Sequence, residues 1–125
     1  MAKIITVTVN TAIDLLLEVE SFVPGETLSA GRSEEFACGK GINVAKAVES
    51  LGHAVLCLGF AGARSIDAFH ALQTERLTTD LTVVSGKTRT NITLHDSARG
   101  KETHIRTAGF SVTDQDCREL IESIK

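Results

Sequence analysis

The chain has 125 residues, of which 42% are hydrophobic and 23% are charged, and its formal net charge is −3. This composition predicts a globular fold with a core and argues against a disordered chain, and the length fits one domain. The sequence shows no Lys/Arg block typical of nucleic-acid binding, no apolar run as long as a membrane span, and no signal peptide at MAKIITVTVN. We therefore expect a cytoplasmic protein with no nucleic-acid partner and no membrane partner.

Cysteine and histidine are scattered through the chain. Cys38, Cys57 and Cys117 form no CxxC motif, and their odd number argues against a disulfide framework. No two of the four histidines stand at i,i+4, so the sequence predicts no metal site. Structural thiols are therefore favoured over catalytic ones.

The first half of the chain alternates strand and helix patterns. Residues 3–9 are β-branched and predict a central strand, and residues 15–20 and 33–37 predict half-exposed strands. A helix is expected over 42–51, followed by Gly52 as its C-terminal glycine, and a buried strand over 54–59. The apolar residues that repeat at helical spacing in this helix are Ile42, Val44, Ala45, Val48 and Leu51.

The second half continues the alternation. Residues 65–76 predict a helix, and Leu81–Val84 predict a short strand. A hairpin is expected from 88–95 and 101–106, and a last helix from Thr113 to Lys125 with Thr113 as its N-cap. The fold class is α/β: a partial Rossmann-type layer with three central strands, an open apolar edge, and a second small sheet that projects from it.

A glycine-lysine turn precedes the 42–51 helix. Gly39, Lys40 and Gly41 match neither the Walker A loop nor the dinucleotide-binding fingerprint. Glycines nevertheless let a ligand approach the backbone, and a helix N-terminus favours an anion. Asn43 in the first turn suits recognition of a hydroxyl group. The alternative is a tight turn with an exposed lysine and a locally bonded asparagine.

Two further groups of polar residues are candidates for ligand binding. Arg89 and Asn91 fall on one face of their strand and suit a phosphate ester, although the solvated face of a hairpin has the same pattern. Asp14 follows the first strand, where α/β proteins bind ligands, and could accept from sugar hydroxyls or cap a turn.

Four stretches together resemble one family. TVTVNTAIDLLLEVESFVPGE, GKGINVAKAVESLG, CLGFAG and GKTRTNITLHD are similar, in order, to the start of a PfkB-type (ribokinase-superfamily) carbohydrate kinase. The most similar branch is the 1-phosphofructokinase and tagatose-6-phosphate kinase group. The resemblance covers nearly all of the chain and implies a ribokinase-like fold with a β-sheet lid.

The resemblance also implies an activity and a set of substrate-binding residues. Family members transfer a phosphoryl group from ATP, with Mg²⁺, to a hydroxyl of a sugar phosphate such as fructose 1-phosphate or tagatose 6-phosphate. It implies substrate-binding roles for Asp14, Gly39, Lys40, Gly41, Asn43, Arg89 and Asn91. In many members the lid also makes a homodimer contact.

The sequence departs from the family pattern in several places. The usual N-P-A-x-D reads Asn10-Thr11-Ala12-Ile13-Asp14, and Cys38 replaces the first glycine of G-G-K-G. The basic residue that often follows Pro24-Gly25-Glu26 is absent. No G-x-G-D motif, which carries the family's catalytic base, occurs in these residues, and family members are more than twice as long.

These departures lead to three hypotheses for the chain. Residues 1–125 are expected to form the N-terminal substrate-binding and lid portion of a PfkB-type kinase, truncated or split, without a catalytic residue. ATP and Mg²⁺ belong to the complete family enzyme, and their binding by this chain alone is doubtful. A complementary C-terminal half or a second copy is the expected partner. The alternatives are a non-catalytic sugar-phosphate binding module and the relic of a disrupted kinase gene.

Overall fold

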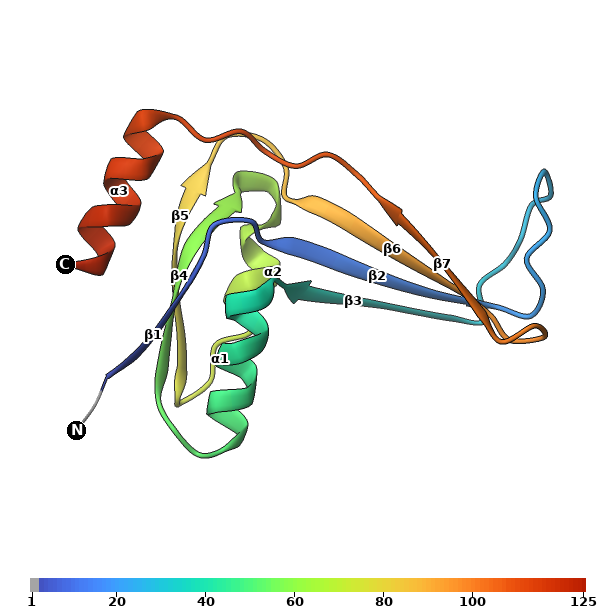
Figure 1. Ribbon diagram of the computed structural model, residues 1–125, viewed down its shortest axis with the longest axis horizontal. Coiled ribbons are helices and arrows are strands. Elements are labelled where there is room, and N and C mark those ends of the chain that lie inside the picture. Colours follow the sequence, from blue (N-terminus) through green and yellow to red (C-terminus); the bar gives the residue numbers. More distant parts are fainter. Residues whose placement is uncertain (1–2) are drawn as a thin grey trace.

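The computed structural model describes residues 3–125, which form two sheets with different surroundings. One sheet carries all the helices and is called the body, and the other projects away from it and is called the lid (Figure 1). The body elements are β1 (Ile4–Thr8), α1 (Lys40–Ser50), β4 (Val55–Gly62), η1 (Ala63–Ser65), α2 (Ile66–His70), β5 (Leu77–Val84) and α3 (Asp114–Ile124). The lid strands are β2 (Ala12–Val19), β3 (Arg32–Cys38), β6 (Arg89–Asp96) and β7 (Lys101–Arg106).

The body sheet has three parallel strands in the order β1-β4-β5. The sequence predicts a layer of three central strands, and the structure adds their order. The central strand β4 is buried along nearly its whole length, which requires helices on both of its faces. Ile42 and Ala45 of α1 and Phe69 of α2 pack with Cys57 on one face of β4. Leu120 of α3 packs with Leu58, Phe60 and Val84 on the opposite face.

Helix α1 buries a narrower face than the sequence predicts. Ile42 and Ala45 are fully buried and Val48 packs against the same core, but Val44 is 53% exposed and Leu51 is 76% exposed. The helix ends at Ser50, and Gly52 follows with φ +90°, as expected for a C-terminal glycine. Helix α1 is therefore held on the sheet by Ile42 and Ala45, which lie one turn apart, and by Val48 one turn further on.

Several predicted elements differ in extent from those of the structure, among them the second helix, β5 and β2. The expected 65–76 helix is shortened to Ile66–His70 after a single 3₁₀ turn, since Thr74 Oγ1 accepts from the backbone N–H groups of Arg76 and Leu77 and closes a turn there. Strand β5 consequently begins at Leu77, earlier than the predicted 81. Strand β2 begins at Ala12 because the buried Thr11 hydroxyl donates to the Phe60 carbonyl (2.6 Å) and holds the chain against the body.

The lid is a four-stranded sheet in the order β3-β2-β6-β7, which confirms the predicted second sheet and hairpin. Strand β2 pairs antiparallel with β3 and parallel with β6. Alternation along the strands separates two faces. The apolar face carries Leu15, Leu17, Ile92, Leu94 and Ile105, and the polar face carries Asp14, Asn91, Thr93, His104 and Arg106.

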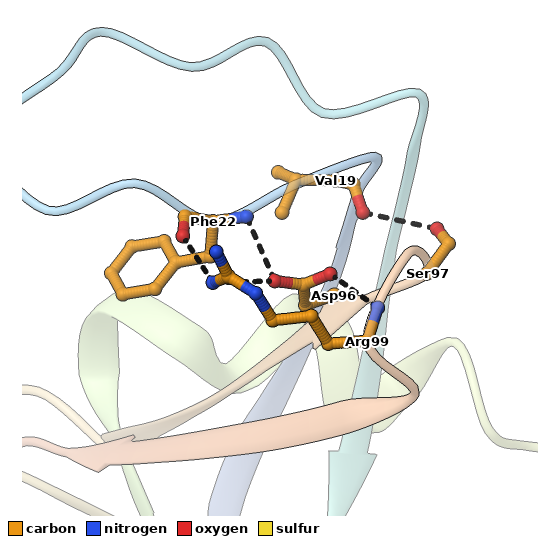
Figure 2. A network of polar contacts seen from close by, with 5 residues as sticks. All are labelled: Val19, Phe22, Asp96, Ser97 and Arg99. Carbon is orange, nitrogen blue, oxygen red and sulfur yellow. Dashed lines mark hydrogen bonds and ion pairs between the residues drawn. The ribbon is translucent and has the colours of Figure 1, made fainter.

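The distal end of the lid is held by one buried carboxylate, Asp96 (Figure 2). Its oxygens accept from the backbone N–H groups of Phe22 (2.9 Å) and Arg99 (3.0 Å). The Arg99 guanidinium lies 3.5 Å from Asp96 and donates to the Phe22 carbonyl (3.1 Å). The Phe22 N–H bond and the bonds from Arg99 lower the pKa of Asp96. This network fastens the long connection between β2 and β3 to the β6–β7 turn.

Gly59 of β4 lies close against the backbone of β1. It lies opposite Thr8 of β1 with φ +149°, a conformation that side chains disfavour. A Cβ at this position would overlap with the Thr8 carbonyl group. The pairing of β1 with β4 next to the lid therefore requires a glycine at position 59.

We predict that Gly59→Ala destabilises the chain by about 2–5 kcal/mol, because the new methyl adds both a steric overlap and a strained φ. The urea midpoint of unfolding measures the effect. Gly31→Ala is the matched control, since nothing lies within 4 Å of a Cβ there and its φ is not positive, and its effect should stay within about 0.5 kcal/mol. Equal midpoints for the two variants would contradict this account of β4.

Candidate functional site

The candidate site lies where the lid joins the body. Three connections run between them at this point: β1 passes into β2 through residues 9–11, β3 passes into α1 through Gly39, and β5 passes into β6 through residues 85–88. Gly39 has φ +146°, a conformation in which a glycine is strongly preferred. The carboxyl end of β1, the start of α1 and the first residues of β6 consequently lie next to one another.

A hydrogen bond joins two of the predicted residues across the lid. Asn91 Nδ2 donates to Asp14 Oδ1 (3.1 Å), as the parallel register that sets Asp14 opposite Asn91 allows. Asn91 Oδ1 is buried and has no partner among the described residues. The pair thus holds the Asp14 carboxylate in a fixed direction and leaves an amide oxygen unsatisfied, which suits a ligand rich in hydroxyl groups.

Two arginines flank this pair on the polar face of the lid. Arg89, two residues before Asn91, donates from Nη2 to the Asn10 carbonyl (3.4 Å), and its buried Nε has no partner among the described residues. Arg106 lies directly opposite Asn91 on β7 and is exposed. Two guanidinium groups beside a carboxylate–amide pair are suited to a ligand that carries both an anionic group and hydroxyl groups.

The start of α1 faces a hollow of about 340 Å³ lined by Val7, Thr8, Val9, Asn10, Lys40, Gly41 and Arg89. Gly39 is the N-cap of α1 and supplies no side-chain acceptor, and the first turn contains no acidic residue. The first N–H groups of the helix and its positive dipole end are therefore available to an electron-rich ligand. Lys40 and Arg89 add cationic side chains to the same hollow.

Cys38 lies beside Asp14 in the site. It ends β3 opposite Ala12, so its side chain is on the polar face next to Asp14, and it is only 7% exposed. Burial, followed by a hydrogen bond to the Asp14 carboxylate and its negative charge, raises the pKa of Cys38 to about 12. The thiol is therefore protonated near neutral pH.

The structure brings most of the seven predicted residues together. Asp14, Arg89 and Asn91 lie on the polar face of the lid, and Lys40 and Gly41 share the hollow with Arg89. Gly39 is buried between Cys38 and the helix. Asn43 is exposed on α1 and does not line the hollow, so the predicted hydroxyl contact has no geometric support in this arrangement.

Sequence reasoning missed Arg106 and undervalued Cys38. If residue 96 pairs with residue 101 in the predicted hairpin, then residue 91 pairs with residue 106. The hairpin pattern could therefore have placed Arg106 opposite Asn91. Arg32 at the start of β3 is paired with Glu34 through an ion pair and a hydrogen bond. The site therefore has an unexpected cation on β7, whereas the arginine of β3 is already engaged by a carboxylate.

The residues of the structure offer no metal centre. Within 3–125, no three His, Cys, Asp or Glu side chains are grouped as a metal ion requires.

A family comparison agrees with this geometry. The model of the pfkB family carbohydrate kinases matches residues 3–125, so the chain belongs to the pfkB family of carbohydrate kinases. The resemblance found in the sequence is confirmed, and so is the ribokinase-like α/β fold class.

Phosphofructokinases are among the proteins and structures similar to the chain. A 1-phosphofructokinase of Xanthomonas campestris is 38% identical over 109 residues, which are 86% of this chain and 34% of that protein. A possible 1-phosphofructokinase of Thermotoga maritima matches with a TM-score of 0.84 and 28% identity over 98% of this chain and 40% of its own. Phosphofructokinase-2 of Escherichia coli in complex with fructose-6-phosphate matches with a TM-score of 0.86 and 25% identity over 99% of this chain and 41% of its own.

The matches cover most of this chain but less than half of each similar protein. The chain spans about 34–41% of the length of the three proteins, although they cover 86–99% of it. Residues 3–125 therefore correspond to one part of a pfkB kinase, and this part contains the lid and the turn before α1.

We predict that Cys38 resists alkylation in the folded chain. At pH 8 iodoacetamide should modify the half-exposed Cys117, while Cys38 reacts only on unfolding, because a thiol with a pKa of about 12 provides almost no thiolate. Asp14→Asn should speed the reaction of Cys38 by removing the charge that favours its protonated form. Site-resolved mass spectrometry measures both rates.

The same pKa difference has a consequence for stability. The unfolded thiol ionises near its ordinary pKa of 9.0 and the folded thiol near 12. Its contribution to the free energy of unfolding is therefore present below pH 9.0 and is lost as the pH rises from there.

Rapid alkylation of Cys38 in the native chain at pH 8 would contradict the raised pKa of this thiol and its position beside Asp14.

Proposed function

We propose that the chain forms the substrate-binding and lid portion of an ATP-dependent sugar-phosphate kinase, with fructose 1-phosphate as the first candidate substrate. The single observation that carries this proposal is the row formed by Asp14, Asn91 and Arg106 across three strands of the lid. The row combines a fixed carboxylate with a cation, and Arg89, two residues before Asn91, lines one hollow together with the uncapped start of α1. Such a combination recognises hydroxyl groups and a phosphate in one molecule.

The site residues divide into two proposed roles. The Asp14 carboxylate, held by Asn91 and Cys38, accepts hydrogen bonds from sugar hydroxyls, and the N–H groups near Gly39 and Gly41 donate to sugar oxygens. Arg89, Arg106 and Lys40 neutralise the phosphate. Asn43 is exposed, so it would contact a sugar hydroxyl only if the substrate extended to the outer side of the first turn of α1.

Substrate binding by these residues orients the acceptor but does not by itself move a phosphoryl group. ATP supplies that group in the proposed reaction, and a kinase needs a nucleotide site and groups that stabilise the transferring phosphoryl. No residue among 3–125 is assigned these roles, and Mg²⁺ is proposed to bind with ATP in the complete enzyme. We therefore propose that turnover requires a complementary portion of the fold outside residues 1–125.

Two further proposals concern the surroundings of the protein. No helix among residues 3–125 has the length and apolar character that crossing a bilayer requires. The cytoplasm, which contains ATP and sugar phosphates, is the compartment that we propose. A second copy is the proposed partner of the apolar lid face, where Ile105 is 50% exposed beside Ile92.

The proposed function predicts saturable binding of sugar phosphates to the purified chain. Isothermal titration calorimetry with fructose 1-phosphate, fructose 6-phosphate, tagatose 6-phosphate and free fructose should show a preference for a phosphorylated sugar. Arg89→Met should weaken binding by about 10–100-fold, the range expected for a lost charge-assisted hydrogen bond. Arg76→Met, at the opposite end of the body sheet, is the matched control and should leave the affinity unchanged.

An assay of ADP release completes the test. With ATP, Mg²⁺ and each sugar phosphate, the chain alone should show no sugar-dependent turnover, since the proposed roles leave it without a nucleotide site. Turnover above the level of an inactive preparation would contradict the division of roles proposed here. Absence of binding by every sugar phosphate, or equal loss in both arginine variants, would contradict the proposed site.

A further inference from the structure

Thr8, the last residue of β1, packs against both glycines of the turn before α1. Its side chain is only 6% exposed. A Cβ built on Gly39 would lie 2.6 Å from Thr8 Cγ2, and a Cβ built on Gly41 would overlap with Thr8 Oγ1. The Thr8 methyl group thus lies against Gly39 and its hydroxyl group against Gly41, so one side chain sets how closely the whole turn approaches the strand.

Packing alone does not explain why residue 8 carries a hydroxyl group. Its oxygen is buried and has no hydrogen-bond partner among the described residues. A buried hydroxyl without a partner is costly, and valine has nearly the same shape without that cost. An oxygen, however, has a smaller radius than a methyl group, so threonine lets Gly41 come closer to β1 than valine would.

The position of Gly41 matters because of what lies in front of it. Thr8, Lys40 and Gly41 line the same hollow, and α1 begins there with no side-chain cap. The direction of the first free N–H groups follows from where Gly39 and Gly41 lie. A displacement of a few tenths of an ångström at Gly41 redirects these donors without disturbing the packing of α1 through Ile42 and Ala45.

We propose that Thr8 is a positioning residue for substrate binding, whose hydroxyl fixes the distance between β1 and the Gly39–Gly41 turn and so aims the first N–H groups of α1 at the ligand. This inference rests on the proposed sugar-phosphate site. It assigns Thr8 no contact with the substrate, because the hydroxyl oxygen is shielded by Gly41.

Three variants separate this role from a general effect on the strand. Thr8→Val keeps the methyl against Gly39 and replaces the oxygen against Gly41 by a larger carbon. Thr8→Ser keeps the oxygen and removes the methyl. Thr6→Val is the matched control: Thr6 lies two residues earlier on the same face of β1, opposite Cys57, and its hydroxyl is likewise buried and unpartnered, but it does not touch the turn.

The experiment has a structural and a binding measurement on the same chain. Amide ¹⁵N shifts of Gly39, Lys40 and Gly41 without ligand report the turn, and calorimetric titration with fructose 1-phosphate reports affinity. Thr8→Val should move these shifts well beyond any change in Thr6→Val and weaken binding by about 5–20-fold, because misaligned donors lose much of their interaction. Thr8→Ser should stay within about threefold of the original affinity, as rescue by the retained hydroxyl requires.

Several results would overturn the inference. Unchanged turn shifts in Thr8→Val would refute it whatever the affinity, as would equal weakening by Thr8→Val and Thr6→Val. Unchanged affinity in Thr8→Val, with an original chain that binds, would refute it and leave the proposed function standing. An original chain that binds no fructose 1-phosphate would instead count against the proposed function and, with it, against a role of Thr8 in binding.

Discussion

The close packing of three glycines around Thr8 is the constraint on which the rest of the structure depends. Gly59 approaches the Thr8 backbone from β4, while Gly39 and Gly41 approach its side chain from the turn before α1. One residue at the end of β1 therefore holds the sheet together on one side and sets the start of α1 on the other. The candidate site lies at this point, where the end of β1, the start of α1 and the first residues of β6 come together.

The lid depends on the same region for its orientation. Thr11 donates to the Phe60 carbonyl just before β2 begins, and Thr88 accepts from Gly62 just before β6 begins. Both hydroxyl bonds fasten the two central lid strands to the end of β4. Because the strands are fixed at their base, Asp14 and Asn91 meet at a defined distance, and Asp96 holds the far end of the sheet without touching the site.

Much of this architecture could be predicted from the sequence, because it rests on local patterns. The β-branched run of β1, the glycine after α1 and the Thr113 N-cap each act within a few residues. The extents of α2 and β5 could not be predicted in this way. They are set by the Thr74 turn and by pairing with β4, which a local pattern does not contain.

The candidate site was predictable in composition but not in geometry. The residue types of Asp14, Arg89 and Asn91 suggested a polar ligand, but 77 residues separate Asp14 from Asn91, and their hydrogen bond follows from strand register. Arg106 enters the site through the same register. No sequence pattern indicated a role for Thr8, because the glycines that pack against it are more than thirty residues away in the chain.

The most direct test of the account is a crystal structure of the chain with fructose 1-phosphate bound. The account predicts sugar hydroxyls against the Asp14 carboxylate, a sugar oxygen facing the first N–H groups of α1, and the phosphate between Arg89 and Arg106. A sugar phosphate bound elsewhere, for example in the hollow beside Lys3 and Arg76 at the opposite end of the body sheet, would contradict it.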